Sequence, residues 1–206
     1  MKFLGTAGGT AVFLWAYFWA LRNPLGEVAV MPATWLDALI GLQPWSFALY
    51  VSLWVYISFG TALARDFREL AAFGWASLGM GLAGLAVFVL VPTRVAEPAI
   101  DWTLYPSLAF LKSIDATGNA CPSLHAAFCV FTGLALHAQL RSIGAPPAVQ
   151  GANALWCLGI LYSTIATGQH VALDALAGAA LGAAAAVPYV RMLRDPQLQT
   201  LRPESP

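Results

Sequence analysis

Residues 162–178 read YSTIATGQHVALDALAG. The segment is largely apolar or small, and it places His170 four residues before a carboxylate, Asp174. On a helix, positions four residues apart share a face, so the carboxylate can accept a hydrogen bond from one imidazole nitrogen and direct the other. Ionisable side chains are costly inside hydrocarbon, so such a pair indicates a function; the alternative is a polar pair that locks two helices together.

The composition of the whole chain indicates an integral membrane protein. Hydrophobic residues make up 59% of the 206 positions and charged residues only 10%, and the mean hydropathy is +0.70. Soluble domains carry about 25% charged residues, so this chain has too little polar surface for a water-exposed globule. The net charge is zero and the ten basic residues are scattered, which argues against nucleic-acid binding. The three cysteines lack metal-ligand spacing and are expected to be small packing residues.

Six stretches are apolar and long enough to span a bilayer, which requires about 20 residues. The sequence therefore predicts an all-α integral membrane bundle of six transmembrane helices, formed by residues 1–194 as one domain. The Pro-rich polar segment 195–206 is expected to be a disordered cytoplasmic tail. The first stretch has no convincing small-residue cleavage site, so we expect a retained span and not a signal peptide. The six stretches are 4–22, 45–64, 71–91, 122–140, 149–166 and 169–190.

The connections between these stretches predict the orientation in the membrane. Residues 23–44 read as a loop with a short interfacial helix near Trp35–Leu42, and residues 92–121 form the longest loop, too polar to cross a bilayer. Six spans place seven basic residues on the side of the termini and three on the other, so the positive-inside rule puts both termini in the cytoplasm. We expect a multi-pass protein of the cell inner (plasma) membrane. The seven are Lys2, Arg65, Arg68, Arg141, Arg191, Arg194 and Arg202, and the three are Arg22, Arg94 and Lys112.

The third and fifth loops each end in a histidine on the predicted outer face. His125 closes the sequence CPSLH where the fourth span begins, and His170 stands where the sixth begins. We expect both in the first turn of a helix, whose unpaired N–H groups and positive dipole end favour an anion. Arg94 ends the third span on this face. Two histidines, a carboxylate, an arginine and two helix N-termini suit phosphate chemistry at the outer face of the membrane.

The sequences CPSLH (121–125) and STIATGQHVALD (163–174) resemble the second and third motifs of the type 2 phosphatidic acid phosphatase (lipid phosphate phosphatase) superfamily. They are most similar to its inositol phosphorylceramide synthase-like branch, whose members pass a phospho-headgroup to an alcohol. The resemblance implies that His170 is a nucleophile that forms a phosphohistidine, that Asp174 orients it, and that His125 protonates the leaving alcohol. It implies no metal and no cofactor.

The same resemblance implies a phosphate-binding set, from which this chain departs. Ser123 is expected to hold a phosphate oxygen, and Ser163 matches the serine that opens the third motif. Phosphatases of the family usually carry an arginine after that serine, where this chain has Thr164. Aligning the first motif on Arg94 leaves valines, Val87 and Val95, where its lysine and proline should stand. Arg94 is then the remaining cation of the motifs, and Lys112 is a candidate to substitute from the loop.

The sequence therefore predicts a membrane enzyme that transfers a phosphoryl or phospho-headgroup from a lipid phosphate or phosphodiester to water or an alcohol. The missing cations favour transfer over simple hydrolysis, and a plain lipid phosphate monoester phosphatase is the alternative. A metal site built from two histidines and a carboxylate is another. A transporter or channel would usually show internal repeats or interrupted helices in both halves, and the sequence shows neither. A catalytically silent membrane-binding relative is the last alternative.

Overall fold

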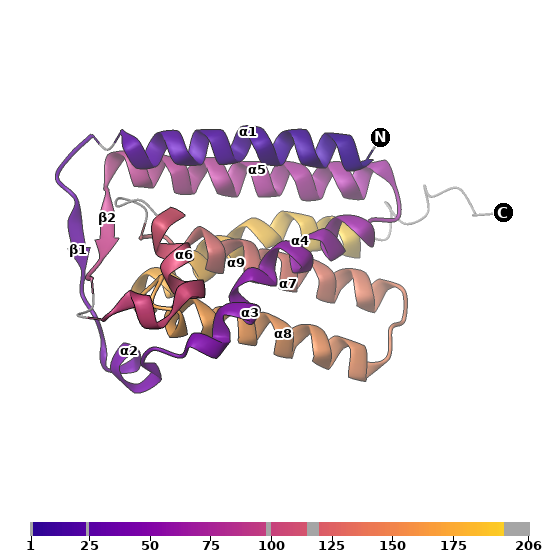
Figure 1. Ribbon diagram of the computed structural model, residues 1–206. Helices are drawn as coiled ribbons and strands as arrows, with labels where there is room; N and C mark the ends of the chain where they lie inside the picture. The colour runs from indigo at the N-terminus through magenta and orange to yellow at the C-terminus, as the bar shows by residue number, and fades with distance from the viewer. Residues whose placement is uncertain (1, 24, 98–99, 115–119, 196–206) are drawn as a thin grey trace.

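The computed structural model describes residues 2–23, 25–97, 100–114 and 120–195 and is mostly helical (Figure 1). The long helices run side by side along one axis, and both termini lie at the same end of the molecule. The elements in chain order are α1 (Lys2–Arg22), β1 (Ala29–Met31), α2 (Trp35–Ile40), the 3₁₀ turn η1 (Pro44–Ser46), α3 (Phe47–Val51), α4 (Leu53–Ala62), α5 (Phe67–Leu90), β2 (Thr93–Val95), the 3₁₀ turn η2 (Trp102–Leu104), α6 (Pro106–Ile114), α7 (Leu124–Ser142), α8 (Pro147–Ala166) and α9 (Ala172–Arg194).

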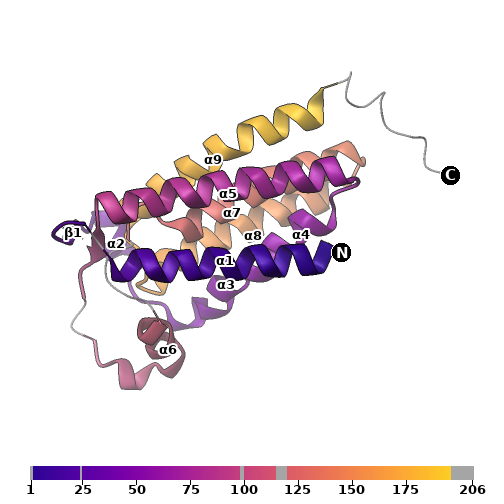
Figure 2. The same ribbon diagram turned by 90° about the horizontal axis from the view of Figure 1, so that it is seen from above.

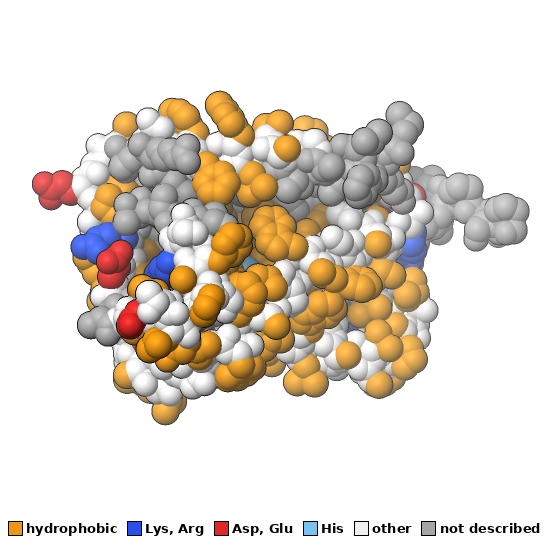
Figure 3. Space-filling model, in the orientation of Figure 1, with side chains coloured by type: hydrophobic (Ala, Val, Ile, Leu, Met, Phe, Trp, Pro, Cys, Tyr) orange, Lys and Arg blue, Asp and Glu red, His pale blue; other side chains and the backbone are white. Residues whose placement is uncertain are grey.

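The length and apolar composition of the helices are those of a membrane protein. Helical segments overlap all six stretches that the sequence nominated, with ends that differ by a few residues. Three helical segments among the described residues are long and apolar enough to cross a membrane, namely Pro44–Ala62, Phe67–Leu90 and Ala172–Arg194. On the face seen in Figure 3, charged side chains lie near the two ends and hydrophobic side chains cover the region between them. The prediction of a helical membrane protein is confirmed, and the number of six spans stays a prediction.

Helix α7 lies at the centre of the bundle and packs most closely against α9. The contact is made at two glycines of α9. A Cβ atom on Gly178 would overlap the carbonyl oxygen of Ser123, and one on Gly182 would overlap that of Ala127. Small residues four positions apart let helix backbones touch in lipid, where close packing replaces the hydrophobic effect as the force that joins helices. This contact sets how the start of α7 lies against the start of α9.

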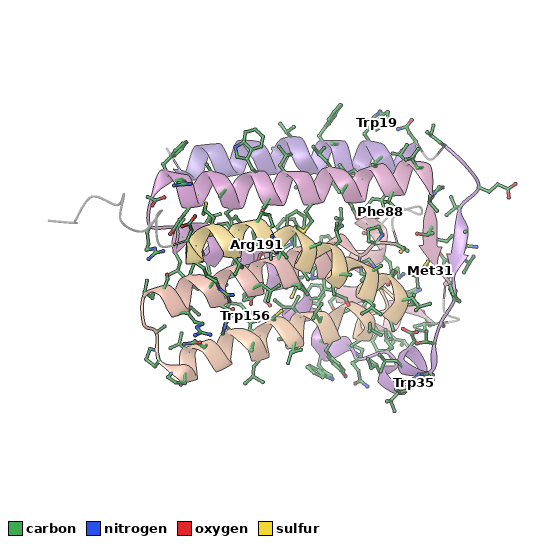
Figure 4. All side chains as sticks on the ribbon, turned by 180° about the vertical axis from the view of Figure 1, so that it is seen from behind. Trp19, Met31, Trp35, Phe88, Trp156 and Arg191 are labelled. Atoms are coloured by element: carbon green, nitrogen blue, oxygen red, sulfur yellow. The ribbon has the colours of Figure 1, made fainter. Side chains whose placement is uncertain are left out.

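Aromatic side chains fill the space between α5, α7 and α9. The ring centroids of Phe73 and Phe131 lie 4.8 Å apart, and Tyr189 packs edge-on against both rings. Seen from behind, Phe88 points from α5 towards the bundle, whereas Trp19 and Trp35 point away from it (Figure 4). The bundle therefore has a packed interior and an apolar outer face, as expected for helices surrounded by lipid.

The longer connections, from α1 to α3 and from α5 to α7, run over the end opposite the termini (Figure 1). Helix α1 packs along α5, and β1 and α2 lie at the far end, with α6 set apart from them on the other side of α1 (Figure 2). Strands β1 and β2 pair in parallel, with Val30 opposite Arg94, which adds a short ribbon to the predicted all-α fold. The β-branched residues of the two segments favour this extended pairing. The predicted loop 92–121 contains η2 and α6 in addition to β2, and the predicted tail lies outside the described residues except for Asp195.

Candidate active site

His170 lies in the turn that leads into α9, with its ring against Asp174. Its Nδ1 atom is 3.2 Å from Oδ2 of Asp174, whose side chain is completely buried. The expectation that His170 occupies the first turn of a helix is wrong, because α9 begins only at Ala172. Gly168, with φ +69°, terminates the preceding turn, and the main-chain N–H of His170 donates to the carbonyl of Thr164 instead of to a helical partner. The ring nevertheless reaches the carboxylate, so the predicted pair exists in a different backbone setting.

His125 is the second residue of α7, as predicted, and the fold brings it to the same place. The main-chain N–H of Ser123 donates to the carbonyl oxygen of Asp174 at 3.0 Å, which ties the start of α7 directly to the first turn of α9. The two imidazoles, His125 and His170, lie close enough to interact electrostatically. The His125 ring stacks on the ring of Tyr50, with centroids 3.9 Å apart and planes 9° from parallel. The structure therefore unites the two sequence motifs at one site.

Three buried polar atoms at this site have no hydrogen-bond partner among the described residues. They are Nε2 of His125, Oδ1 of Asp174 and Nε2 of Gln169. Nearly all buried polar groups in folded proteins are hydrogen-bonded, and leaving one unsatisfied costs about 1–3 kcal/mol. Three such atoms on neighbouring residues are therefore typical of a site whose polar groups serve chemistry and not packing.

The predicted phosphate-binding serines make local hydrogen bonds. Ser123 caps α7, its Oγ accepting from the N–H of Ala126 at 3.2 Å. The hydroxyl of Ser163 donates to the carbonyl of Ile160 at 2.6 Å, one turn back on α8. Thr164, at the position of the family's usual arginine, is bonded in the same way to Leu161. Ser123, Ser163 and Thr164 are all completely buried.

The two candidate cations lie at the same end of the bundle but are not bonded to the histidines within the described parts of the chain. Arg94 is half-buried in β2. The Lys112 ammonium lies over the indole of Trp102, 5.6 Å from the ring centroid. Trp102 in turn lies against the turn at Gly168, where an added Cβ would be 4.0 Å from its ring. The fold thus brings Lys112 to the neighbourhood of the His170 turn through Trp102.

Asp37 on α2 is a site-forming residue that sequence reasoning missed. Its Oδ1 accepts from the N–H of Ala172 at 2.7 Å, and its Oδ2 accepts from the N–H and hydroxyl of Thr34. A carboxylate of the protein therefore occupies the N-terminus of α9, which corrects the expectation that two helix N-termini face a substrate anion. The Thr34-x-x-Asp37 pattern signals a capping box in the sequence. The hydrogen bond from Asp37 to the start of α9 leaves no pattern in the sequence around Asp37.

Thr93 on β2 also went unnoticed in the sequence. Its Oγ1 accepts from the N–H of Cys121 at 2.8 Å, and its carbonyl accepts from Ala120 at 3.0 Å, which holds the loop before α7 against the strand ribbon. Burial raises the pKa of the Cys121 thiol, and the nearby negative charge of Asp174 raises it further. Cys121 is therefore a neutral neighbour of the carboxylate. Within the described ranges, no group of three or more His, Cys, Asp or Glu side chains could hold a metal ion.

Comparison with known proteins gives one match. A family model described as the PAP2 superfamily matches residues 29–187. The matched range includes both histidine motifs, Asp37, Arg94 and Lys112, and excludes all of α1 and the end of α9. Neither a curated protein nor a solved structure matches this chain.

Proposed function

Because the chain belongs to the PAP2 superfamily and is thus a phosphatase-type lipid enzyme of the membrane, we propose that it transfers a phosphoryl or phospho-headgroup through His170. The donor is a lipid phosphate or phosphodiester, and the acceptor is water or an alcohol. The observation that carries this proposal is the arrangement of the two histidines. One is backed by the buried carboxylate of Asp174, and the other lies beside it with an Nε2 that has no hydrogen-bond partner in the described part of the chain.

In the first step, the Nε2 lone pair of His170 attacks phosphorus. The bond from phosphorus to the leaving oxygen breaks, and the proton on Nε2 of His125 moves to that oxygen, which departs as an alcohol. Asp174 accepts the Nδ1–H of His170 and so keeps Nε2 unprotonated and directed at the substrate. Its negative charge also stabilises the positive charge that the imidazole acquires when the P–N bond forms. A phosphate anion bound between the rings favours the protonated His125 that this step needs.

In the second step, the oxygen of water or of an acceptor alcohol attacks phosphorus and gives its proton to Nε2 of His125. The P–N bond breaks, and its electron pair returns to His170. Both histidines are then in their starting states, so the cycle closes without a metal or a cofactor. The acceptor that reaches phosphorus first decides whether the enzyme hydrolyses its donor or makes a new ester.

The charges at the site favour a phosphodiester donor. A phosphate monoester carries about −1.5 to −2 near neutral pH, and desolvating that charge requires several cations. Thr164 replaces an expected arginine and is bonded to its own helix. The N-terminus of α9 is occupied by Asp37. A diester carries one negative charge, which Arg94, the α7 N-terminus and a protonated His125 can balance.

We further propose six spans with the site on the outer face of the inner membrane. The support is the distribution of described basic residues between the two ends of the bundle. Arg65, Arg68, Arg141, Arg191 and Arg194 lie on the segments at the end of the termini, whereas Arg94 and Lys112 lie on those at the end of the site (Figure 1). Loops rich in arginine and lysine stay in the cytoplasm, so the histidines face outward.

The test is to incubate purified enzyme with matched monoester and diester lipids, with and without inositol, glycerol and diacylglycerol, and to identify every product. We expect the diester to react faster and the alcohols to appear in product. Rapid monoester hydrolysis with no alcohol incorporated would make the enzyme a plain lipid phosphatase. His170→Ala is the control for chemistry at this site, and a chelator arm tests the metal alternative, which predicts loss of activity.

A further inference from the structure

The two histidines of the site are held by different kinds of partner. His170 is bonded to a carboxylate. His125 instead lies flat on the phenol ring of Tyr50, and the main-chain carbonyl of Tyr50 accepts a hydrogen bond from its ring. Since Nε2 of His125 has no partner among the described residues, the bonded atom is Nδ1. Tyr50 thus fixes both the plane of this imidazole and the identity of its free nitrogen.

Resting on the proposed function, we propose that Tyr50 is the positioning residue that makes His125 the acid of the reaction. A donated Nδ1–H leaves Nε2 as the atom that gains and gives a proton. A neutral carbonyl stabilises an imidazolium less than a carboxylate does, so His125 releases its proton to a leaving oxygen more readily than His170 would. The difference between the two partners therefore assigns the two roles: His170 attacks and His125 donates.

The ring of Tyr50 adds a second effect. The face of an aromatic ring attracts a cation placed over it. The phenol ring of Tyr50 and the imidazole of His125 are 9° from parallel, with centroids 3.9 Å apart. The stack therefore holds the charged imidazole at the moment when the proton is delivered. Phenylalanine offers the same face, whereas leucine and methionine fill a similar volume without one.

The position of Tyr50 in the fold explains how it reaches the site. It lies near the end of α3, which ends at Val51, and Ser52 separates α3 from α4. The Ser52 hydroxyl donates to the carbonyl of Leu49 at 2.6 Å and accepts from the indole of Trp156 at 2.9 Å. Such bonds from serine to its own helix backbone bend helices. The interruption lies next to the turn that presents Tyr50 to the start of α7.

The experiment compares two donors that share the same phospho-headgroup and differ in the leaving group, one an alkyl alcohol and the other p-nitrophenol. An aryl oxide leaves without being protonated, so only the alkyl donor needs the acid. The rate of leaving-group release in a single turnover reports the first step alone, without the second step in which His125 acts as a base. For Tyr50→Leu we expect this rate to fall about 10²-fold on the alkyl donor and to stay within about threefold on the aryl donor. Tyr50→Phe should resemble the wild type on both donors, and His125→Ala should show the same selective loss as Tyr50→Leu.

Two kinds of result overturn the proposal. Equal losses on both donors in Tyr50→Leu would mean that the ring only supports the fold, and no loss on either would mean that His125 does not depend on it. Tyr50→Met repeats the measurement if the leucine variant does not fold. If the wild type acts through His170 and Tyr50→Leu shows equal losses or no loss, only the inference about Tyr50 is refuted. Full activity of His170→Ala refutes the proposed function as well.

Discussion

Gly178→Ala tests whether the contact between α7 and α9 builds the site. An added Cβ would lie 2.9 Å from the carbonyl carbon and 3.1 Å from the nitrogen of Ser123, and it would overlap the carbonyl oxygen. An ordinary C···O contact is about 3.3 Å, so the start of α7 must move away from α9 by about 1 Å. That movement carries His125 away from His170, which stays on the α9 side.

We expect two effects of this substitution. Misplacement of a reacting group by about 1 Å costs about 10²-fold in rate, so kcat of Gly178→Ala should fall by that factor. Overpacking a helix contact costs about 1–3 kcal/mol, which should lower the thermal midpoint in detergent. The assays are initial rates on the best lipid donor and thermal unfolding followed by circular dichroism.

Two matched variants separate these effects. Gly151→Ala on α8 adds a Cβ with no atom within 4 Å, so it should leave the rate unchanged. Alanine favours a helix over glycine, so this variant should be as stable as the wild type or more stable by up to about 1 kcal/mol. Gly182→Ala creates the same kind of overlap, with Ala127, one helical turn further from the histidines. It should lose comparable stability and retain more activity. A Gly178→Ala protein with wild-type kcat and wild-type thermal midpoint would refute the argument that this backbone contact positions the site.

The other predictions concern single side chains and the orientation. His170→Ala should abolish turnover, whereas Asp174→Asn should retain a trace, about 10²- to 10⁴-fold below wild type; equal rates for the two variants in a lipid-phosphate assay would contradict their separate roles. In a cysteine-free background, a single cysteine at Thr103 should react with an impermeant thiol reagent in intact cells and one at Ser142 only after permeabilisation; the reverse pattern would invert the orientation. Asp37→Ala should lower stability by about 1 kcal/mol, measured by thermal unfolding, and unchanged stability would mean that α2 does not hold the His170 turn.

The sequence was sufficient for features that depend on local information. Hydropathy over about 20 residues located the helices, because apolar length is what a bilayer requires. The spacing of His170 and Asp174 was sufficient to pair them. Each of these inferences uses residues within one or a few helical turns of one another.

The features that the sequence could not reveal join distant segments. Asp37 and Ala172, 135 residues apart, are bonded through a capping box that looks purely local in the sequence. The stack of Tyr50 on His125 joins α3 to α7. No pattern along the chain encodes which helices become neighbours, so residues that act through such contacts appear only in three dimensions.

The start of α9 shows how a local prediction can fail. The sixth predicted span starts at Gln169, and the four-residue spacing of His170 and Asp174 fits a helix, which led to a helix that includes His170. The positive φ of Gly168 and the bond from His170 N–H to Thr164 form a turn there instead, and Asp37 supplies the cap at Ala172. The start of α9 therefore depends on Asp37, a residue of another helix, α2.

The most direct test of the central claim is to find the covalent intermediate. A donor lipid labelled in its phosphate is mixed with enzyme, the reaction is stopped in alkali within the first turnover, and the modified peptide is identified by mass spectrometry. Alkali preserves a phosphoimidazole that acid would destroy. The account predicts label on His170, forming and decaying as fast as product appears, and none in His170→Ala. Turnover without labelled protein, or label on any other residue, would contradict it.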